Sequence, residues 1–354
     1  MSLAELIRSI PLFEGLDAAR LEPILRISQR ASFSPGSHIV RQGQAADSAF
    51  ALENGTVEVI TALPGGGELK VAELGPGSIL GEMALLENAV RSATVIARTA
   101  SSGYFIERDA FRMLLAQRDD TAFEIQHRIT RTLCERLRDL NARIVQAIAP
   151  ETDGDAALVG RQDVTQASRL VPEFDWRGFL PLLPPFRRLR ADEVDELAGA
   201  VNVFALEPGA PIFAEGSAAD SGFIVVRGAL EILRGERGRM RRIGVLGPGR
   251  MCGVLAMIEG EVHSMTARAR ERTVLMEIGR ELFERLFYGH DRLAAKFQDA
   301  VNQELLQALA RTNNQLTRLI SQARIRAHRG KRTEVKALET ALAAQDCTAA
   351  SEEP

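Results

Sequence analysis

The chain has 354 residues, 45% of them hydrophobic and 26% charged, a composition typical of a soluble protein of two or three domains. Its 44 basic and 47 acidic residues leave a net charge of −3, so no overall positive field favours nucleic acid or an anionic membrane. Three widely separated cysteines predict neither a disulfide framework nor a zinc site. Because the chain shows no signal-peptide pattern and no membrane-length apolar run, we expect a cytoplasmic protein.

The first third of the chain changes from helical to β-type patterns and back. Residues 1–30 predict short amphipathic helices, and residues 31–106 alternate short β-type runs with turns, as in a β-barrel or jelly roll. The segment 109–148 predicts a helix that carries a narrow apolar stripe, as in a coiled-coil seam. The stripe residues are Ile125, Ile129, Leu133, Leu137, Leu140 and Ile144.

This whole pattern occurs twice. At an offset of 172, Gly81 matches Gly253 and Phe111 matches Phe283. The repeat predicts an α+β fold, mainly β, made of two tandem β-rolls of the jelly-roll type, each with flanking helices and a long C-terminal helix. We expect a first domain at 1–148, a linker at 149–177, a second domain at 178–323 and a charged helical or disordered tail at 324–354.

The most informative stretch lies between residues 75 and 97. It combines Gly81 and Glu82, on a turn that opens a short helix, with Arg91 and Ser92. Glycine lets backbone approach a ligand closely, helix-start N–H groups favour anions, and arginine can fork onto a phosphate. A nearby carboxylate can accept a hydrogen bond from a sugar hydroxyl. These groups together predict a site for a cyclic nucleotide.

The sequence GEMALL followed by RSAT closely resembles the phosphate-binding cassette of cyclic-nucleotide-binding domains, as in the catabolite activator protein and protein kinase A regulatory subunits. The resemblance implies that Glu82 holds the ribose 2′-OH, Arg91 pairs with the cyclic phosphate and Ser92 adds a phosphate contact. It also implies that further residues line the cassette through backbone groups, namely Gly81, Met83, Ala84 and Ala93. Serine at position 92 resembles the catabolite activator protein, so cAMP is favoured over cGMP. The resemblance implies no catalytic residue, metal or cofactor.

The second copy keeps the spacing of the cassette without its charged pair. Val254 stands at the position of Glu82, and His263 at that of Arg91. Because a cyclic phosphate without its arginine loses a charged hydrogen bond worth about 1.5–3 kcal/mol, we expect no ordinary nucleotide binding there. A protonated His263 that attracts an anion is the alternative.

Several residues have two interpretations. Leu140 and Asn141 lie where the family's long helix lowers a lid onto the base, but both also fit helix packing, since Asn313 repeats Asn141 beside the degenerate site. Ser92 either bonds phosphate or caps a turn. The basic run from 324 to 332 either binds nucleic acid or is a solvated helix face.

We therefore expect a bacterial cyclic nucleotide receptor, not an enzyme, that signals through contacts with an unknown effector protein. The bacterial origin is suggested by the excess of arginine over lysine. About thirty residues after the second long helix are too few for a winged helix-turn-helix, which predicts against DNA binding. The alternatives are a ligand-independent scaffold or dimerisation protein and a transcriptional regulator. We expect helix 109–148 to pack beside helix 281–323 as an intramolecular pseudo-dimer, with a homodimer as the rival arrangement.

Overall fold

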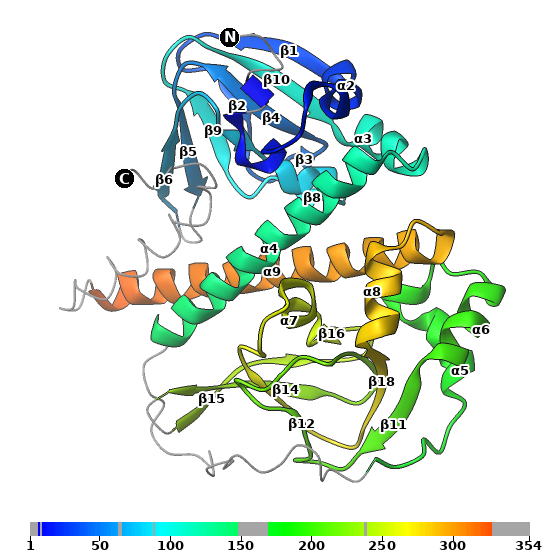
Figure 1. Ribbon diagram of the computed structural model, residues 1–354. Helices are drawn as coiled ribbons and strands as arrows, with labels where there is room; N and C mark the ends of the chain where they lie inside the picture. Colours follow the sequence, from blue (N-terminus) through cyan, green and yellow to red (C-terminus); the bar gives the residue numbers. More distant parts are fainter. Residues whose placement is uncertain are drawn as a thin grey trace. The chain divides into compact units, whose positions relative to one another are not determined.

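Figure 1 shows a computed structural model of the chain, which describes residues 6–7, 9–62, 66–87, 89–147, 169–236 and 239–327. These residues form two compact units. The first unit consists of the described residues up to 147 and of those from 306 on, which form the second half of the last helix. The second unit consists of the described residues from 169 to 305. Each unit contains one β-roll, as the internal repeat predicts.

The β-roll of the first unit has two four-stranded antiparallel sheets. Across the first sheet the strands are β1 (Ser28–Phe33), β10 (Ser101–Glu107), β4 (Ser48–Asn54) and β7 (Ile79–Leu80). Across the second they are β2 (His38–Val40), β9 (Thr94–Ala97), β5 (Val57–Ala62) and β6 (Glu68–Leu74), and β3 (Ala45–Ala46) pairs separately with β8 (Ala89–Val90). Apolar side chains of both sheets form one core, among them Phe50, Leu52, Val57, Val59 and Val95.

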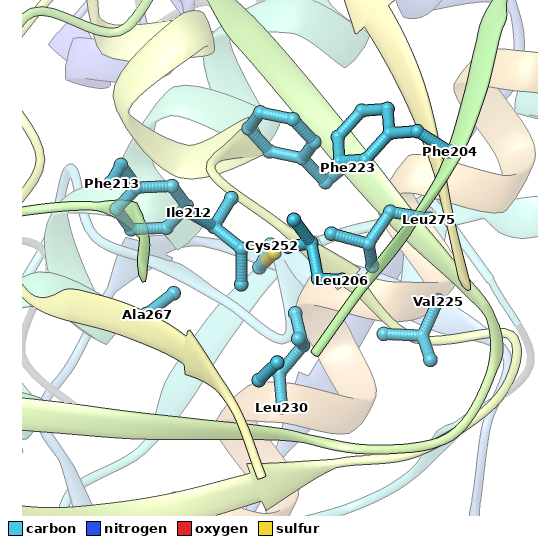
Figure 2. Close-up of a cluster of buried hydrophobic side chains, with 11 residues drawn as sticks. Phe204, Leu206, Ile212, Phe213, Phe223, Val225, Leu230, Cys252, Ala267 and Leu275 are labelled. Atoms are coloured by element: carbon cyan, nitrogen blue, oxygen red, sulfur yellow. The ribbon is translucent and has the colours of Figure 1, made fainter. Parts of the chain in front are cut away.

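The second unit repeats this arrangement. One sheet contains β11 (Asn202–Leu206), β18 (Thr273–Gly279), β13 (Ser221–Arg227) and β16 (Met251–Cys252). The other contains β12 (Pro211–Phe213), β17 (Thr266–Ala269), β14 (Leu230–Glu236) and β15 (Arg239–Leu246). Figure 2 shows its core, where the rings of Phe204 and Phe223 lie side by side and Cys252 is enclosed among aliphatic side chains. Burial raises the pKa of the Cys252 thiol, so this cysteine is an inert core residue.

A glycine at the equivalent turn of each β-roll shows that the two units share the same local backbone structure. Gly55 has φ +90°, and a Cβ there would lie 2.7 Å from the α-carbon of Ser101. Gly228 has φ +86°, and a Cβ there would lie 2.8 Å from the α-carbon of Thr273. Only glycine tolerates both the positive φ and the close backbone approach, so the turn that leads from one sheet to the other depends on it in each β-roll.

Helices flank each β-roll. Those of the first unit are η1 (Pro11–Phe13), α2 (Ala18–Arg26), η2 (Glu82–Leu85), α3 (Arg108–Ala116) and α4 (Asp120–Ala147). Those that follow are α5 (Trp176–Phe179), η4 (Leu180–Leu182), η5 (Pro184–Phe186), α6 (Ala191–Ala200), α7 (Val254–Glu259), α8 (Arg280–Tyr288) and α9 (Arg292–Ala327). None of the helices within the described residues is long and apolar enough to cross a membrane.

The predicted single helices 109–148 and 281–323 are each interrupted, which corrects the sequence interpretation. The first breaks at residues 117–119, where Arg118 has φ +61°, and the second breaks at 289–291. In both, an aspartate caps the new helix: Asp119 accepts the backbone N–H of residue 122 at 2.8 Å, and Asp291 accepts that of residue 294 at 2.8 Å. The six stripe residues of α4 are buried. Their pairing with the second long helix stays a prediction.

Residues 169–177, assigned to the linker by sequence, are folded onto the second β-roll. Leu170 exchanges two backbone hydrogen bonds with Ala205 of β11, at 3.0 and 2.7 Å. The second unit therefore includes residues before 178. Helix α9 also continues past residue 323 to Ala327, while the rest of the predicted tail and residues 148–168 lie outside the described residues.

Candidate functional site

The site in the first unit is built around Gly81, which precedes η2 with φ +69°. A Cβ at this position would lie 2.5 Å from Nη1 of Arg91 and 3.3 Å from the carbonyl oxygen of Ser48. The guanidinium of Arg91 therefore lies directly against the glycine backbone, which a larger residue would prevent. The predicted turn thus brings the start of η2 and Arg91 together.

Arg91 is held in place by the loop that enters β4. Its Nη1 donates to the carbonyl oxygen of Ser48 at 2.7 Å, and its Nη2 donates to Oγ of Ser48 at 3.0 Å and to Oδ1 of Asp47 at 3.2 Å. The side chain is 8% exposed. Burial lowers the pKa of the Arg91 guanidinium, whereas the neighbouring carboxylate of Asp47 raises it. An arginine nevertheless stays charged at any physiological pH. The result is a fixed, buried cation.

Glu82 is the first residue of η2 and is 5% exposed. Its Oε1 lies 2.9 Å from Nη2 of Arg136 in α4, although the angles fall outside hydrogen-bond geometry, so the contact is an ion pair. Nη1 of Arg136 also approaches Sδ of Met83 at 3.9 Å. The long helix α4 therefore reaches the carboxylate of Glu82 at the start of η2.

The other predicted site residues differ in exposure. Ala84 and Ala93 are buried, Met83 is half-buried and Ser92 is exposed next to Arg91. On α4, Leu140 is completely buried and Asn141 is half-buried. Burial of Leu140 is typical of a packing residue, and a lid role for Leu140 and Asn141 stays a prediction.

Sequence reasoning missed Asp47, Ser48 and Arg136. Two signals were present. The pair Asp47 and Ser48 recurs as Asp220 and Ser221 at an offset of 173. Arg136 lies four residues before Leu140, which places both on one helix face. The recurring Asp-Ser pair does not single out a binding site, because it also occurs in the degenerate copy. The position of Arg136 identifies a helix face, but not the residue that this face contacts.

The corresponding turn in the second unit keeps the glycine with positive φ, but the two charged side chains of the first unit are absent there. Gly253 has φ +81°, and a Cβ there would lie 3.0 Å from the carbonyl oxygen of Ser221 and 3.3 Å from Cε1 of His263. The His263 ring is 4% exposed and stacks on Phe213, with ring centroids 3.8 Å apart and an interplanar angle of 8°. Val254, at the position of Glu82, is also buried. A stacked ring and a hydrocarbon side chain thus stand where the first unit has Arg91 and Glu82.

Comparison with known proteins identifies the family of the chain. The family model described as "Cyclic nucleotide-binding domain" matches residues 30–118 and 203–290, half of the chain. The chain therefore belongs to the cyclic nucleotide-binding domain family and carries two such domains in tandem, a family whose domains bind cyclic nucleotides as ligands and for which no cofactor is indicated.

Three similar proteins illustrate the range of this family. A cAMP-dependent protein kinase regulatory subunit of Yarrowia lipolytica is 26% identical over 78% of this chain and 58% of its own length. A cyclic nucleotide-gated potassium channel of Mesorhizobium japonicum is 36% identical over 33% of this chain and 31% of its own length. The cAMP-bound regulatory domain of Toxoplasma gondii PKA superimposes with a TM-score of 0.32 and 20% identity, over 87% of this chain and 95% of that one.

The chain spans 58% and 56% of the length of the first two curated relatives that it matches, both of them eukaryotic regulatory subunits. Bacterial proteins also match, over shorter stretches. The bacterial origin suggested by the arginine content is therefore not supported by these similarities.

Proposed function

We propose that this chain is a cyclic nucleotide receptor whose first domain binds cAMP, or with less preference cGMP, and which signals by protein–protein contact. The observation that carries the proposal is the burial of Glu82 and Arg91 next to Gly81, at the start of η2. A buried carboxylate and a buried guanidinium match the sugar hydroxyl and the single phosphate charge of a cyclic nucleotide.

In this proposal the two residues have separate tasks. The guanidinium of Arg91, oriented by Asp47 and Ser48, pairs with the cyclic phosphate. The carboxylate of Glu82 accepts the ribose 2′-OH, and the exposed hydroxyl of Ser92 adds a phosphate contact. The backbone of Gly81, Met83, Ala84 and Ala93 lines the site.

The second domain serves as a structural copy that does not bind a cyclic nucleotide in the usual way. Val254 offers no acceptor for a sugar hydroxyl, and the His263 ring is stacked on Phe213. Moving this ring towards an anion would break the stack and leave its partner ring uncovered.

Signalling follows from the contact between Arg136 and Glu82. A ribose hydroxyl and the guanidinium of Arg136 compete for one carboxylate, so ligand binding changes how α4 is held against η2. A ligand shifts an equilibrium only through such a difference in contacts between two states. We propose that an effector protein in the cytoplasm reads the position of α4 and that the chain itself has no enzyme activity. The naming of its Yarrowia relative as a regulatory subunit supports a protein partner.

Calorimetric titration of the nucleotide-stripped chain with cAMP and then cGMP tests the proposal. We expect one site per chain, with affinity weakened at least about tenfold in Arg91→Ala, because a charged hydrogen bond is lost. His263→Ala is the matched control and leaves the titration unchanged. No heat and no thermal shift with either nucleotide would overturn the receptor proposal and favour a ligand-independent scaffold.

A further inference from the structure

Helix η2 of the first unit ends in a place that water hardly reaches. Leu85, Leu86 and Glu87 are 1%, 2% and 6% exposed. The last carbonyl groups of a helix have no partner within the helix, and a buried carbonyl without a hydrogen bond is costly. The end of η2 therefore needs a donor from elsewhere in the unit.

Arg112 of α3 supplies this donor. Its Nη1 donates to the carbonyl oxygen of Leu86 at 3.0 Å. Arginine side chains can satisfy the terminal carbonyls of a helix in this way, and a cation at this end also suits the helix dipole. Arg112 is half-buried, so solvent competes with the bond only in part. The end of η2 is thus held by a side chain 26 positions further along the chain.

The second unit closes its equivalent helix in a different way. Helix α7 is followed by Gly260, which has φ +70° and donates its backbone N–H to the carbonyl oxygen of Ala256. Gly260 is exposed, so water reaches this helix end. At the offset of 172, position 88 of the first unit is asparagine, and Glu284 stands at the position of Arg112. Because an ionised glutamate has no N–H to donate, the degenerate copy relies on a glycine cap instead of an arginine.

A second arginine of the same helices shows which contacts belong to the shared architecture. Arg108 begins α3, and its Nη1 donates to the carbonyl oxygen of Ala46 at 3.0 Å. Arg280 begins α8 and donates to the carbonyl oxygen of Ala219. Both copies keep this link between helix and β-roll. Only the copy with the charged cassette has the further arginine at position 112.

We propose that Arg112 is a positioning residue of the nucleotide site, which acts by capping η2. This helix is a four-residue 3-10 helix, about 8 Å long, and so short a helix is held mainly by tertiary contacts. Its start is fixed where Gly81 packs against Arg91, and its end is fixed by Arg112. With both ends held, Glu82 keeps one orientation before the ligand arrives, which reduces the ordering that binding requires. This inference rests on the proposed receptor function.

Calorimetric titration of the full chain with cAMP tests the positioning role. We expect Arg112→Met to bind cAMP at least about fivefold more weakly, because a loosened η2 must be ordered again on binding. Arg112→Lys keeps a charged donor and should recover part of the loss. Glu284→Met is the matched control at the same position of the second unit and leaves the affinity unchanged.

Hydrogen exchange of the ligand-free chain separates local capping from general stability. We expect the amides of Ala84 and Leu86, which bond within η2 and its end, to exchange at least about fivefold faster in Arg112→Met. Exchange in β4 and α7 should not change. Faster exchange across the whole first unit, with unchanged cAMP affinity, would show a purely structural residue and overturn the proposal.

Two results of the titration would also decide against this role. A higher cAMP affinity in Arg112→Met would overturn the proposal, since the cap would then oppose the ligand. Equal affinities of wild type and Arg112→Met would overturn this proposal alone, and the receptor function would stand. No binding of cAMP or cGMP by the wild-type chain would overturn both.

Discussion

The guanidinium of Arg136 in α4 lies 2.9 Å from the carboxylate of Glu82, the residue that we propose as the acceptor of a ribose hydroxyl. The Glu82 side chain is 7% exposed and that of Arg136 is 17% exposed, so solvent screens this ion pair only weakly. The long helix and the proposed ligand site are thus linked through one carboxylate.

Arg136→Ala tests this link. We expect the ligand-free first unit to melt at a lower temperature, because the buried Glu82 loses its cationic neighbour. The affinity for cAMP should rise by about fivefold, since removal of a competitor worth about 1 kcal/mol frees the carboxylate for the ribose. Calorimetry and thermal melting measure both effects, and Glu82→Gln serves as the control that loses binding. A weaker affinity in Arg136→Ala would mean that Arg136 assists the ligand instead of competing with it.

Gly81→Ala and Gly253→Ala form a matched pair across the two copies. Both residues have positive φ, so both substitutions should lower the melting temperature by straining the backbone, at a cost of about 1–2 kcal/mol. Only Gly81→Ala should also abolish nucleotide binding, because its Cβ would displace Nη1 of Arg91 from a position 2.5 Å away. Titration with cAMP after a fold check by circular dichroism separates the two effects. Equal loss of binding in both variants would assign a ligand role to the second copy.

The stability of the second unit should depend on pH through Glu304. Burial raises the pKa of this carboxyl to about 7, against the opposing influence of Arg250, whose Nη2 lies 3.0 Å away. Because the folded state binds the proton more tightly than the unfolded state, stability rises as pH falls through 7 towards the unfolded value near 4.5. We expect a gain of about 1 kcal/mol between about pH 8 and about pH 6.

Urea unfolding followed by the fluorescence of Trp176, the single tryptophan of the chain, measures this pH dependence in the second unit. Glu304→Gln should remove most of the pH dependence and be more stable than wild type at about pH 8, because the neutral amide avoids the burial of a charge. A variant with the same slope as wild type would contradict the assignment to Glu304.

Arg169 fastens residues 169–174 to the second β-roll. Its guanidinium donates to both oxygens of Glu277, at 2.7 and 3.1 Å, and its Cζ lies 4.3 Å from the centroid of the Phe204 ring. Since the arginine side chain is about half exposed, we expect Arg169→Ala to destabilise the second unit by only about 1 kcal/mol. Arg169→Lys keeps the charge without the fork or the stacking and should recover little of the loss. Trp176 fluorescence again reports the change, and full recovery by lysine would show that charge alone matters.

Much of the fold could be predicted because its signals are local. Short β-type runs separated by turns, together with the repeat offset, indicated two β-rolls, and the structure has them. The helix breaks before α4 and α9 were missed, since the apolar stripe that indicated the first long helix begins at Ile125, after the interruption, and so does not report it. The start of the second unit was also missed, because Leu170 joins β11 by backbone pairing that composition does not reveal.

The sequence by itself determined the cassette, because Gly81, Glu82 and Arg91 lie within one turn, one short helix and the loop that follows. It also determined the loss of this pair in the second copy, where Val254 and His263 can be identified by spacing alone. Only the tertiary structure decided which groups surround these residues: Asp47 and Ser48 around Arg91, Arg136 beside Glu82, and Phe213 against His263. These contacts join segments far apart in the chain, and their formation depends on sheet register and helix packing, which local spacing does not encode.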